Sequence, residues 1–157
     1  MRTVDQRVVR APPAVVWRHA VDVEHWPGIL SHYRWVTRTA GSAAADGTVE
    51  MAAWRPFGPF RWPTWWRSAM EVDAARRRIT YRHIAGITTG MDVLWTIEPT
   101  AEDWSNVTIV HEWNGPRWPL IGGLAASQVI GPVFVHGIAS RTLAGIAAAA
   151  EGTTHSP

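Results

Sequence analysis

Apolar and polar residues alternate with a period of two along four segments between residues 61 and 113, and this alternation restricts what the chain can fold into. Successive residues of a β-strand point to opposite faces, so each segment has one apolar face and one mostly wet face. A sheet with a single covered face is typically antiparallel. The residues expected on the covered face are Trp66, Ser68, Met70, Ile79, Tyr81, His83, Met91, Val93, Trp95, Ile97, Val107, Ile109, His111 and Trp113.

Turn signals divide the chain into strands of about ten residues. Small and polar residues fill 41–47, and glycine, proline or aspartate mark the later breaks. A first strand is expected over Val4–Arg10, before the proline pair that follows Ala11. Together these signals predict one antiparallel sheet of seven strands. The six strands after the first are expected over 33–41, 48–55, 61–73, 78–85, 90–99 and 104–113.

Two short helices are expected between the first and second strands. Pro12 and Pro13 can begin a helix over Ala14–Val21, because the N–H that proline lacks would be unpaired in the first turn anyway. Trp26 and Pro27 should interrupt any helix that runs through them, which leaves a second short helix. The expected order is therefore strand, helix, short helix, strand.

A long helix is expected at the C-terminal end. Residues 125–150 are small, apolar and nearly free of breakers, although Gly131-Pro132 should kink the helix or delay its start. Gly152 should end it. We therefore expect a single domain over 1–151 and a disordered tail over 152–157.

This set of elements predicts an internal cavity. One helix is about 10 Å wide and cannot cover a broad sheet, because neighbouring strands add nearly 5 Å each. The expected C-terminal helix is rich in alanine, glycine and serine, which leave volume unfilled. The chain also has 11 tryptophans, and these could fill the space instead. We expect a pocket, since the polar residues of the covered face would otherwise be buried without partners.

Composition excludes several classes of protein. The chain has no cysteine and no lysine, so thiol chemistry and a lysine Schiff base are excluded. It lacks a run of 18 apolar residues and a signal-peptide core, which makes the cytoplasm the expected compartment, without stable membrane insertion. The run Arg76-Arg77-Arg78 is short and lies at an expected turn, so no nucleic-acid partner is predicted. Motifs for nucleotide cofactors or an esterase nucleophile are lacking, and no cofactor is expected.

Several short motifs resemble those of a known family. The N-terminal ones are Ala11-Pro12, Val16-Trp17, the run from Asp22 to Pro27 with its Trp-Pro pair, and Ser31-His32-Tyr33. Further along, Trp66-Arg67-Ser68, Trp95-Thr96 and the run from Val110 to Trp113 match expected strands. Together they resemble the START/Bet v1-like (SRPBCC) superfamily, and most of all its polyketide cyclase/dehydrase branch. The resemblance implies an α+β helix-grip fold, in which a curved seven-stranded antiparallel sheet surrounds a long C-terminal helix, with two short helices after the first strand.

The same resemblance implies a site, and this chain departs from it. Trp26 and Tyr33 look like aromatic residues of the pocket mouth, Ser68 like the pocket serine and Trp95 like a stacking wall. Cyclases of the family tend to carry an arginine two residues after that serine, where this chain has Met70. His83 stands at a second arginine position and His111 at a glutamine position. The cations that would polarise a carbonyl are therefore missing or replaced.

Histidines on the covered face are the candidates for chemistry. His83 and His111, together with Ser68, could perform general acid–base work, since histidine titrates near neutrality. Each could instead be a core histidine with a hydrogen-bond partner. A zinc site formed with His136 is a third possibility, but the ligand spacing does not support it, and no metal is predicted. The residues expected to contact a ligand are Trp26, Tyr33, Trp66, Met70, Tyr81, Trp95, Ile109, Trp113 and His136.

Two functions of different class follow. The chain could bind a hydrophobic or aromatic small molecule in its cavity, as a carrier or sensor of a polyketide, lipid or quinone. Alternatively, it could be a cofactor-independent aromatase/cyclase that closes an aldol ring on a poly-β-ketone and removes water. The missing arginine favours binding, and the inward histidines favour catalysis. We expect ligand binding and leave open both catalysis and a homodimer.

Overall fold

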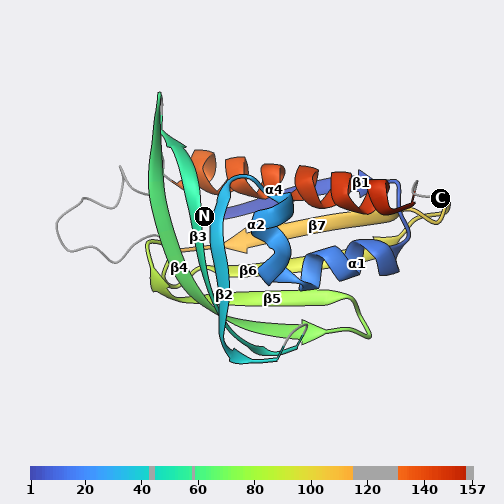
Figure 1. Cartoon of the computed structure of the whole chain (residues 1–157), viewed down its shortest axis with the longest axis horizontal. Coiled ribbons are helices and arrows are strands. Elements are labelled where there is room, and N and C mark those ends of the chain that lie inside the picture. Colours follow the sequence, from blue (N-terminus) through green and yellow to red (C-terminus); the bar gives the residue numbers. More distant parts are fainter. Residues whose placement is uncertain (43–44, 58, 115–130, 155–157) are drawn as a thin grey trace.

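The computed structural model describes residues 1–42, 45–57, 59–114 and 131–154. Within them lie one seven-stranded antiparallel sheet, short helices after the first strand and a long C-terminal helix (Figure 1). The α+β helix-grip fold expected from the sequence is therefore confirmed. The elements are β1 (Arg2–Val9), α1 (Pro13–Val21), η1 (Val23–His25), α2 (Trp26–Ile29), β2 (Tyr33–Gly41), β3 (Gly47–Phe57), β4 (Phe60–Asp73), β5 (Arg78–Gly86), β6 (Asp92–Pro99), β7 (Ser105–Glu112) and α4 (Gly131–Thr154).

The sheet bends around the long helix. Its strand order is β1-β7-β6-β5-β4-β3-β2, so chain neighbours pair throughout except at β1, which pairs with β7. β2, β3 and β4 run across the direction of β6, β7 and β1 (Figure 1). The helix α4 runs beside β1 over the concave face. Bulges interrupt the pairing twice between β2 and β3 and once between β4 and β5, at Arg67/Ser68. A bulge increases local bend and twist, which helps the sheet to close around the helix.

The covered face agrees with the alternation in the sequence. Of the 14 side chains expected there, His111 is half-buried and the other 13 are buried. The period of two therefore predicted which face meets α4.

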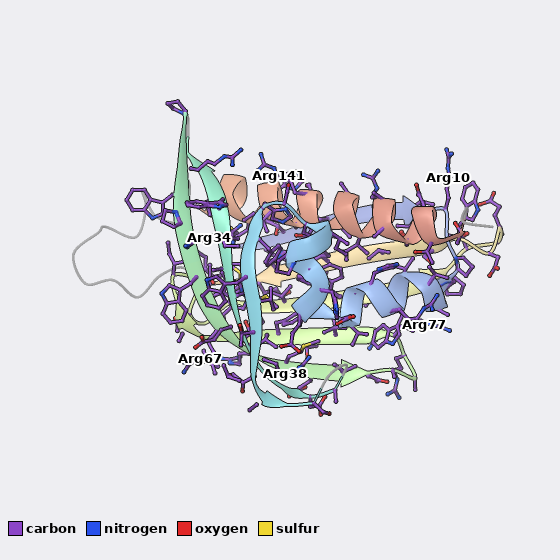
Figure 2. All side chains as sticks on the ribbon, in the orientation of Figure 1. Arg10, Arg34, Arg38, Arg67, Arg77 and Arg141 are labelled. Carbon is purple, nitrogen blue, oxygen red and sulfur yellow. The ribbon has the colours of Figure 1, made fainter. Side chains whose placement is uncertain are left out.

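The arginines labelled in Figure 2 are spread from one end of the molecule to the other rather than gathered on one patch.

α4 presents small and aliphatic side chains to the sheet. Its buried residues include Ile138, Thr142 and Ile146. The helix was expected to end at Gly152, but it continues to Thr154. Threonine hydroxyls in the last turn donate to carbonyl oxygens of the preceding turn, which offsets the low helix propensity of the glycine. The expected start at 125–130 and the end of the expected tail, 155–157, lie outside the described residues.

The Trp-Pro pair separates two helical segments, η1 and α2, as the sequence predicted. α2 starts at Trp26, and Pro27 occupies its first turn, where the missing N–H costs nothing. Behind α2, Gly145 of α4 faces Leu30 closely, since a Cβ at position 145 would lie 2.2 Å from a methyl carbon of that leucine. The short helices can approach α4 because this position lacks a side chain. None of the helices in the described ranges combines the length and hydropathy of a membrane-spanning segment.

Candidate functional site

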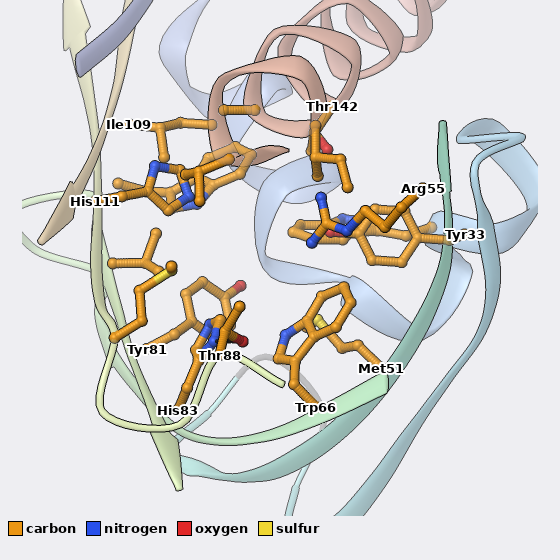
Figure 3. Close-up of a pocket in the computed structure, with 17 residues that line it drawn as sticks. Tyr33, Met51, Arg55, Trp66, Tyr81, His83, Thr88, Ile109, His111 and Thr142 are labelled. Carbon is orange, nitrogen blue, oxygen red and sulfur yellow. Dashed lines mark hydrogen bonds between the residues drawn. The ribbon is translucent and has the colours of Figure 1, made fainter. Parts of the chain in front are cut away.

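A cavity of about 60 Å³ lies between the concave face of the sheet, α2 and α4 (Figure 3). Strands β2 to β7 supply most of its walls, and one face of α4 closes it. The volume is enough for a few water molecules, whereas an engineered apolar cavity of about 150 Å³ binds benzene. The expected internal space therefore exists, but aromatic side chains leave only a small part of it empty.

Aromatic rings form a continuous wall. The ring centroid of Trp26 lies 5.3 Å from that of Tyr33 and 5.6 Å from that of Trp95, and Tyr33 lies 6.1 Å from Trp66. The indole N–H of Trp26 donates to the carbonyl oxygen of His19 at 2.9 Å, which fixes the ring at the end of α1. Such edge and tilted contacts are the favourable arrangements of aromatic pairs. The wall is thus apolar and well ordered by its own contacts.

Arg55 brings a positive charge into this wall. Its side chain is 5% exposed and lines the cavity from β3, with the guanidinium carbon 5.3 Å from the ring centroid of Trp66 (Figure 3). Burial lowers the pKa of Arg55 to about 10, so the group still carries its charge at neutral pH. The cavity therefore contains a cation, and its position differs from the arginine positions expected from the family resemblance.

A short hydrogen bond holds His83 in the cavity wall. Its Nδ1 lies 2.5 Å from the hydroxyl of Thr88, and its ring stacks on Trp66 with 5.9 Å between centroids. The bulge at Arg67/Ser68 places His83 directly across from Ser68, on the concave face of the sheet. Burial lowers the pKa of His83 to about 3, helped by the charges of His111 and Arg55. His83 is therefore neutral at physiological pH.

Two further polar groups line the cavity without a hydrogen-bond partner. They are Nδ1 of His111 and the hydroxyl of Tyr81, and both atoms are buried. Burial lowers the pKa of His111 to about 4, and Arg55 acts in the same direction. Burial also raises the pKa of Tyr81, so its phenol keeps its proton. A buried polar atom without a partner requires an explanation, and a bound water or ligand is the ordinary one.

A second polar group of residues lies where β2 meets α4. His32 is buried, with Nε2 3.0 Å from the hydroxyl of Thr142. Burial lowers the pKa of His32 to about 4. Burial also raises the pKa of the neighbouring Tyr33 to about 12, although Arg55 and a hydrogen bond with Thr142 act in the opposite direction. At neutral pH, therefore, Arg55 is the charged member of this group.

Most of the residues expected at a ligand site come together here. Sequence reasoning missed three polar lining residues, namely Arg55, Thr88 and Thr142. Arg55 continues the alternation of Val49, Met51 and Ala53 along β3, so the same pattern could have found it. The expected residues that line the cavity are Trp26, Tyr33, Trp66, Tyr81, His83, Trp95, Ile109 and His111.

Four expected residues lie elsewhere. Ser68 is fully buried beside the cavity but does not line it, and its hydroxyl has no hydrogen-bond partner. Met70 is buried in the adjacent core, and the indole N–H of Trp113 donates to a backbone carbonyl of the β5–β6 turn. His136 pairs with the buried Asp5 at 2.5 Å and is largely exposed. In the described ranges no three histidine, aspartate or glutamate side chains could hold a metal ion together.

The chain resembles proteins of known structure along its whole length. One is TTHA0849 from Thermus thermophilus, with a TM-score of 0.81 and 19% identity, covering 98% of this chain and 99% of that one. Another is the Zhui aromatase/cyclase from Streptomyces sp. R1128, with a TM-score of 0.81 and 17% identity, covering 99% and 96%. The di-domain aromatase/cyclase BexL reaches a TM-score of 0.72 and 22% identity, and this chain spans about half of it (48%). Identities this low show a shared fold.

The sequence itself matches a family model. The model is described as "Polyketide cyclase / dehydrase and lipid transport", and the match covers residues 1–151. No curated protein sequence gives a significant match to this chain.

Proposed function

Because this chain belongs to the polyketide cyclase/dehydrase and lipid transport family, we propose that it binds an oxygen-bearing aromatic small molecule in its cavity. The observation that supports this most is the pair of unpartnered polar atoms in the lining, on Tyr81 and His111. Each loses its hydration on folding at a cost of about 1–3 kcal/mol unless something inside the cavity bonds to it. Aromatic walls with a few polar groups are typical of small-molecule sites.

The size of the cavity limits how a ligand enters. About 60 Å³ is too small even for benzene, so a ring can bind only when lining side chains move aside. Met51 and Met91 can make such room, because methionine side chains are flexible and adapt to irregular gaps. A compact ligand of one or two rings fits this requirement better than a long poly-β-ketone.

Histidine chemistry favours binding over proton transfer. The pKa values of about 3 for His83 and about 4 for His111 lie far below neutral pH. A general acid or base works best when its pKa is close to the operating pH. We therefore assign the two histidines the role of neutral hydrogen-bond partners that orient the ligand.

A cyclase is the second candidate, and Arg55 is the observation that favours it. A buried guanidinium at the cavity wall could polarise a ketone and stabilise the enolate that precedes aldol closure. In that case Arg55, His83 and His111 would carry the reaction, and Ser68 would support the wall from outside the lining. The compartment and a homodimer stay predictions from the sequence.

Filling the cavity tests the proposal. Ala139→Phe places a ring inside it, because Ala139 lines the cavity from α4 and is 3% exposed. Ala144→Phe is the matched control on the exposed face of the same helix. Binding of single-ring and two-ring phenols and quinones, measured by calorimetry, should disappear in the first variant and persist in the second. Equal binding in both folded variants would show that the cavity is not the site.

A separate measurement addresses catalysis. A linear poly-β-ketone analogue is incubated with the protein, and ring closure is followed by mass spectrometry. Production of a cyclised compound that is lost in His83→Ala and His111→Ala, with ligand binding retained, would favour the cyclase. Binding without cyclisation in the unmodified protein would favour a carrier.

A further inference from the structure

The position of Arg55 inside the cavity carries an inference about the ligand. The residue belongs to the concave face of β3, where its cross-strand neighbour is Trp62. The guanidinium lies against Trp66 and points into the cavity, on the same side as Tyr33 (Figure 3). Stacking on an aromatic ring engages the face of a guanidinium, whereas its N–H donors lie along the edge. That edge is suited to bind an oxygen atom in a fixed direction.

The charge of Arg55 reaches the other titratable groups of the cavity. It is one of the causes that lower the pKa values of His83 and His111, and it also acts to lower the pKa of Tyr33. The effect on each histidine disfavours its positively charged form, and the effect on Tyr33 favours its negatively charged form. In a poorly hydrated interior such effects are much stronger than in water. An acidic group of a ligand at the same place would experience the same positive potential.

The opposite side of the cavity is neutral and polar. His111 and Ile109 face Arg55 across the space (Figure 3), and the hydroxyl of Tyr81 is the second unpartnered group of the lining. A phenol can donate to an oxygen atom of a ligand, while a neutral imidazole donates or accepts according to its tautomer. The lining thus offers a cationic end and a neutral hydrogen-bonding end, with aromatic rings between them.

We propose that the cavity takes an anion, namely a compact aromatic compound whose ionised oxygen, carboxylate or phenolate, lies at the guanidinium of Arg55. A second oxygen of the compound bonds to Tyr81 or His111. This inference rests on the proposed function, because it names the chemical class of ligand for the same cavity.

The ionisation of a bound coloured phenol tests the sign of the charge. 4-Nitrophenol absorbs visible light only as the phenolate, so its pH titration can be followed when it is bound to the full-length protein. We expect the bound phenol to ionise at least about one pH unit below the free compound, which means that the phenolate binds at least about tenfold more tightly than the phenol. In a cavity without a positive potential, burial would shift the ionisation upward instead.

Variants identify the source of the shift. Arg55→Met removes the charge and keeps an unbranched side chain, whereas Arg55→Lys keeps the charge. Arg34→Met is the matched control, because Arg34 also stacks on a tryptophan, Trp54, with 4.8 Å to the ring, but is exposed on the surface. We expect the downward shift to survive in Arg55→Lys and Arg34→Met and to reverse in Arg55→Met.

A comparison of an anionic with a neutral ligand separates the two possible failures. Benzoate and benzamide have similar shapes, and calorimetry on the unmodified protein should show benzoate binding at least about tenfold more tightly. Benzamide binding as tightly as benzoate, or an upward shift of bound 4-nitrophenol, would overturn the anion proposal and leave the cavity as a site for neutral ligands. Failure of all three compounds to bind would count against the proposed function itself. Because this comparison needs no substitution, it holds even if Arg55→Met does not fold.

Discussion

Buried neutral histidines should make this protein acid-sensitive well above the pKa values of its carboxylates. His83 and His111 have pKa values of about 3 and about 4 in the folded protein, because burial and Arg55 disfavour their cationic forms. In the unfolded chain both return to about 6.5. Stability is therefore complete above about pH 6.5 and is lost as the pH falls toward the folded values, since the unfolded state binds more protons.

The expected loss can be calculated. Each buried histidine costs about 1.4 kcal/mol per pH unit below its unfolded pKa, until the folded pKa is reached. Between about pH 7.5 and about pH 5.5 the two histidines together should lower the free energy of unfolding by about 3 kcal/mol. That is a large part of the total stability expected for a domain, which is about 5–15 kcal/mol.

Urea denaturation at the two pH values measures this difference. His111→Gln removes one of three buried histidines that titrate in this range, since His32 also has a pKa of about 4, and should reduce the pH-dependent loss by about a third, whatever its effect on stability at neutral pH. His25→Gln is the control, because His25 is fully exposed and pairs with Asp22 at 2.8 Å. His32 contributes equally in all three proteins. If His111→Gln loses as much stability on acidification as the unmodified protein, then His111 is not held neutral in the fold and the reasoning fails.

Two substitutions test the contacts that position the site. Thr88→Val removes the hydroxyl that bonds to His83, and it should lower the free energy of unfolding by about 1–3 kcal/mol in thermal or urea melts. Thr89→Val is the control in the same turn. Its side chain is exposed, so the free energy of unfolding should change by about 0.5 kcal/mol. Gly145→Ala should destabilise the fold by about 1 kcal/mol, because its methyl group would displace the tip of the Leu30 side chain and approach the carbonyl oxygen of Ile29, and the loss of a helical glycine offsets part of this cost. Gly137→Ala, with open space around it, should stabilise the fold by up to about 1 kcal/mol. Equal effects within either pair would contradict the packing described above.

The sheet could be predicted from the sequence because its signal is local. Alternation and turn residues act over two to ten positions, and each strand bound was predicted to within a few residues. The ends of α4 were harder, because hydroxyl groups in the last turn extend the helix past a glycine that would ordinarily end it. The break at the Trp-Pro pair could be predicted, since proline is compatible with a first helical turn and incompatible with a helix interior.

The site was harder to predict because it depends on contacts between distant residues. Arg55 lies near the end of β3, a strand whose alternation was not used to assign its faces, and a charged side chain is rarely buried. Thr88 lies in a turn, where no alternation of apolar and polar residues indicates which way a side chain points. His136 was expected to contact the ligand, but it pairs with Asp5 of β1 and is largely exposed. Such pairings depend on how the helix sits on the sheet, which the sequence alone does not specify.

The close contact between Gly145 and Leu30 has a consequence for ligand size. Leu30 directly follows the short helix whose first residue, Trp26, lines the cavity. A larger side chain at position 145 would displace the Leu30 side chain and press on the carbonyl oxygen of Ile29, the last residue of that helix. The capacity of the chamber can therefore be changed at a position that never touches its contents, so proteins of this fold with identical linings can differ in the largest molecule they admit.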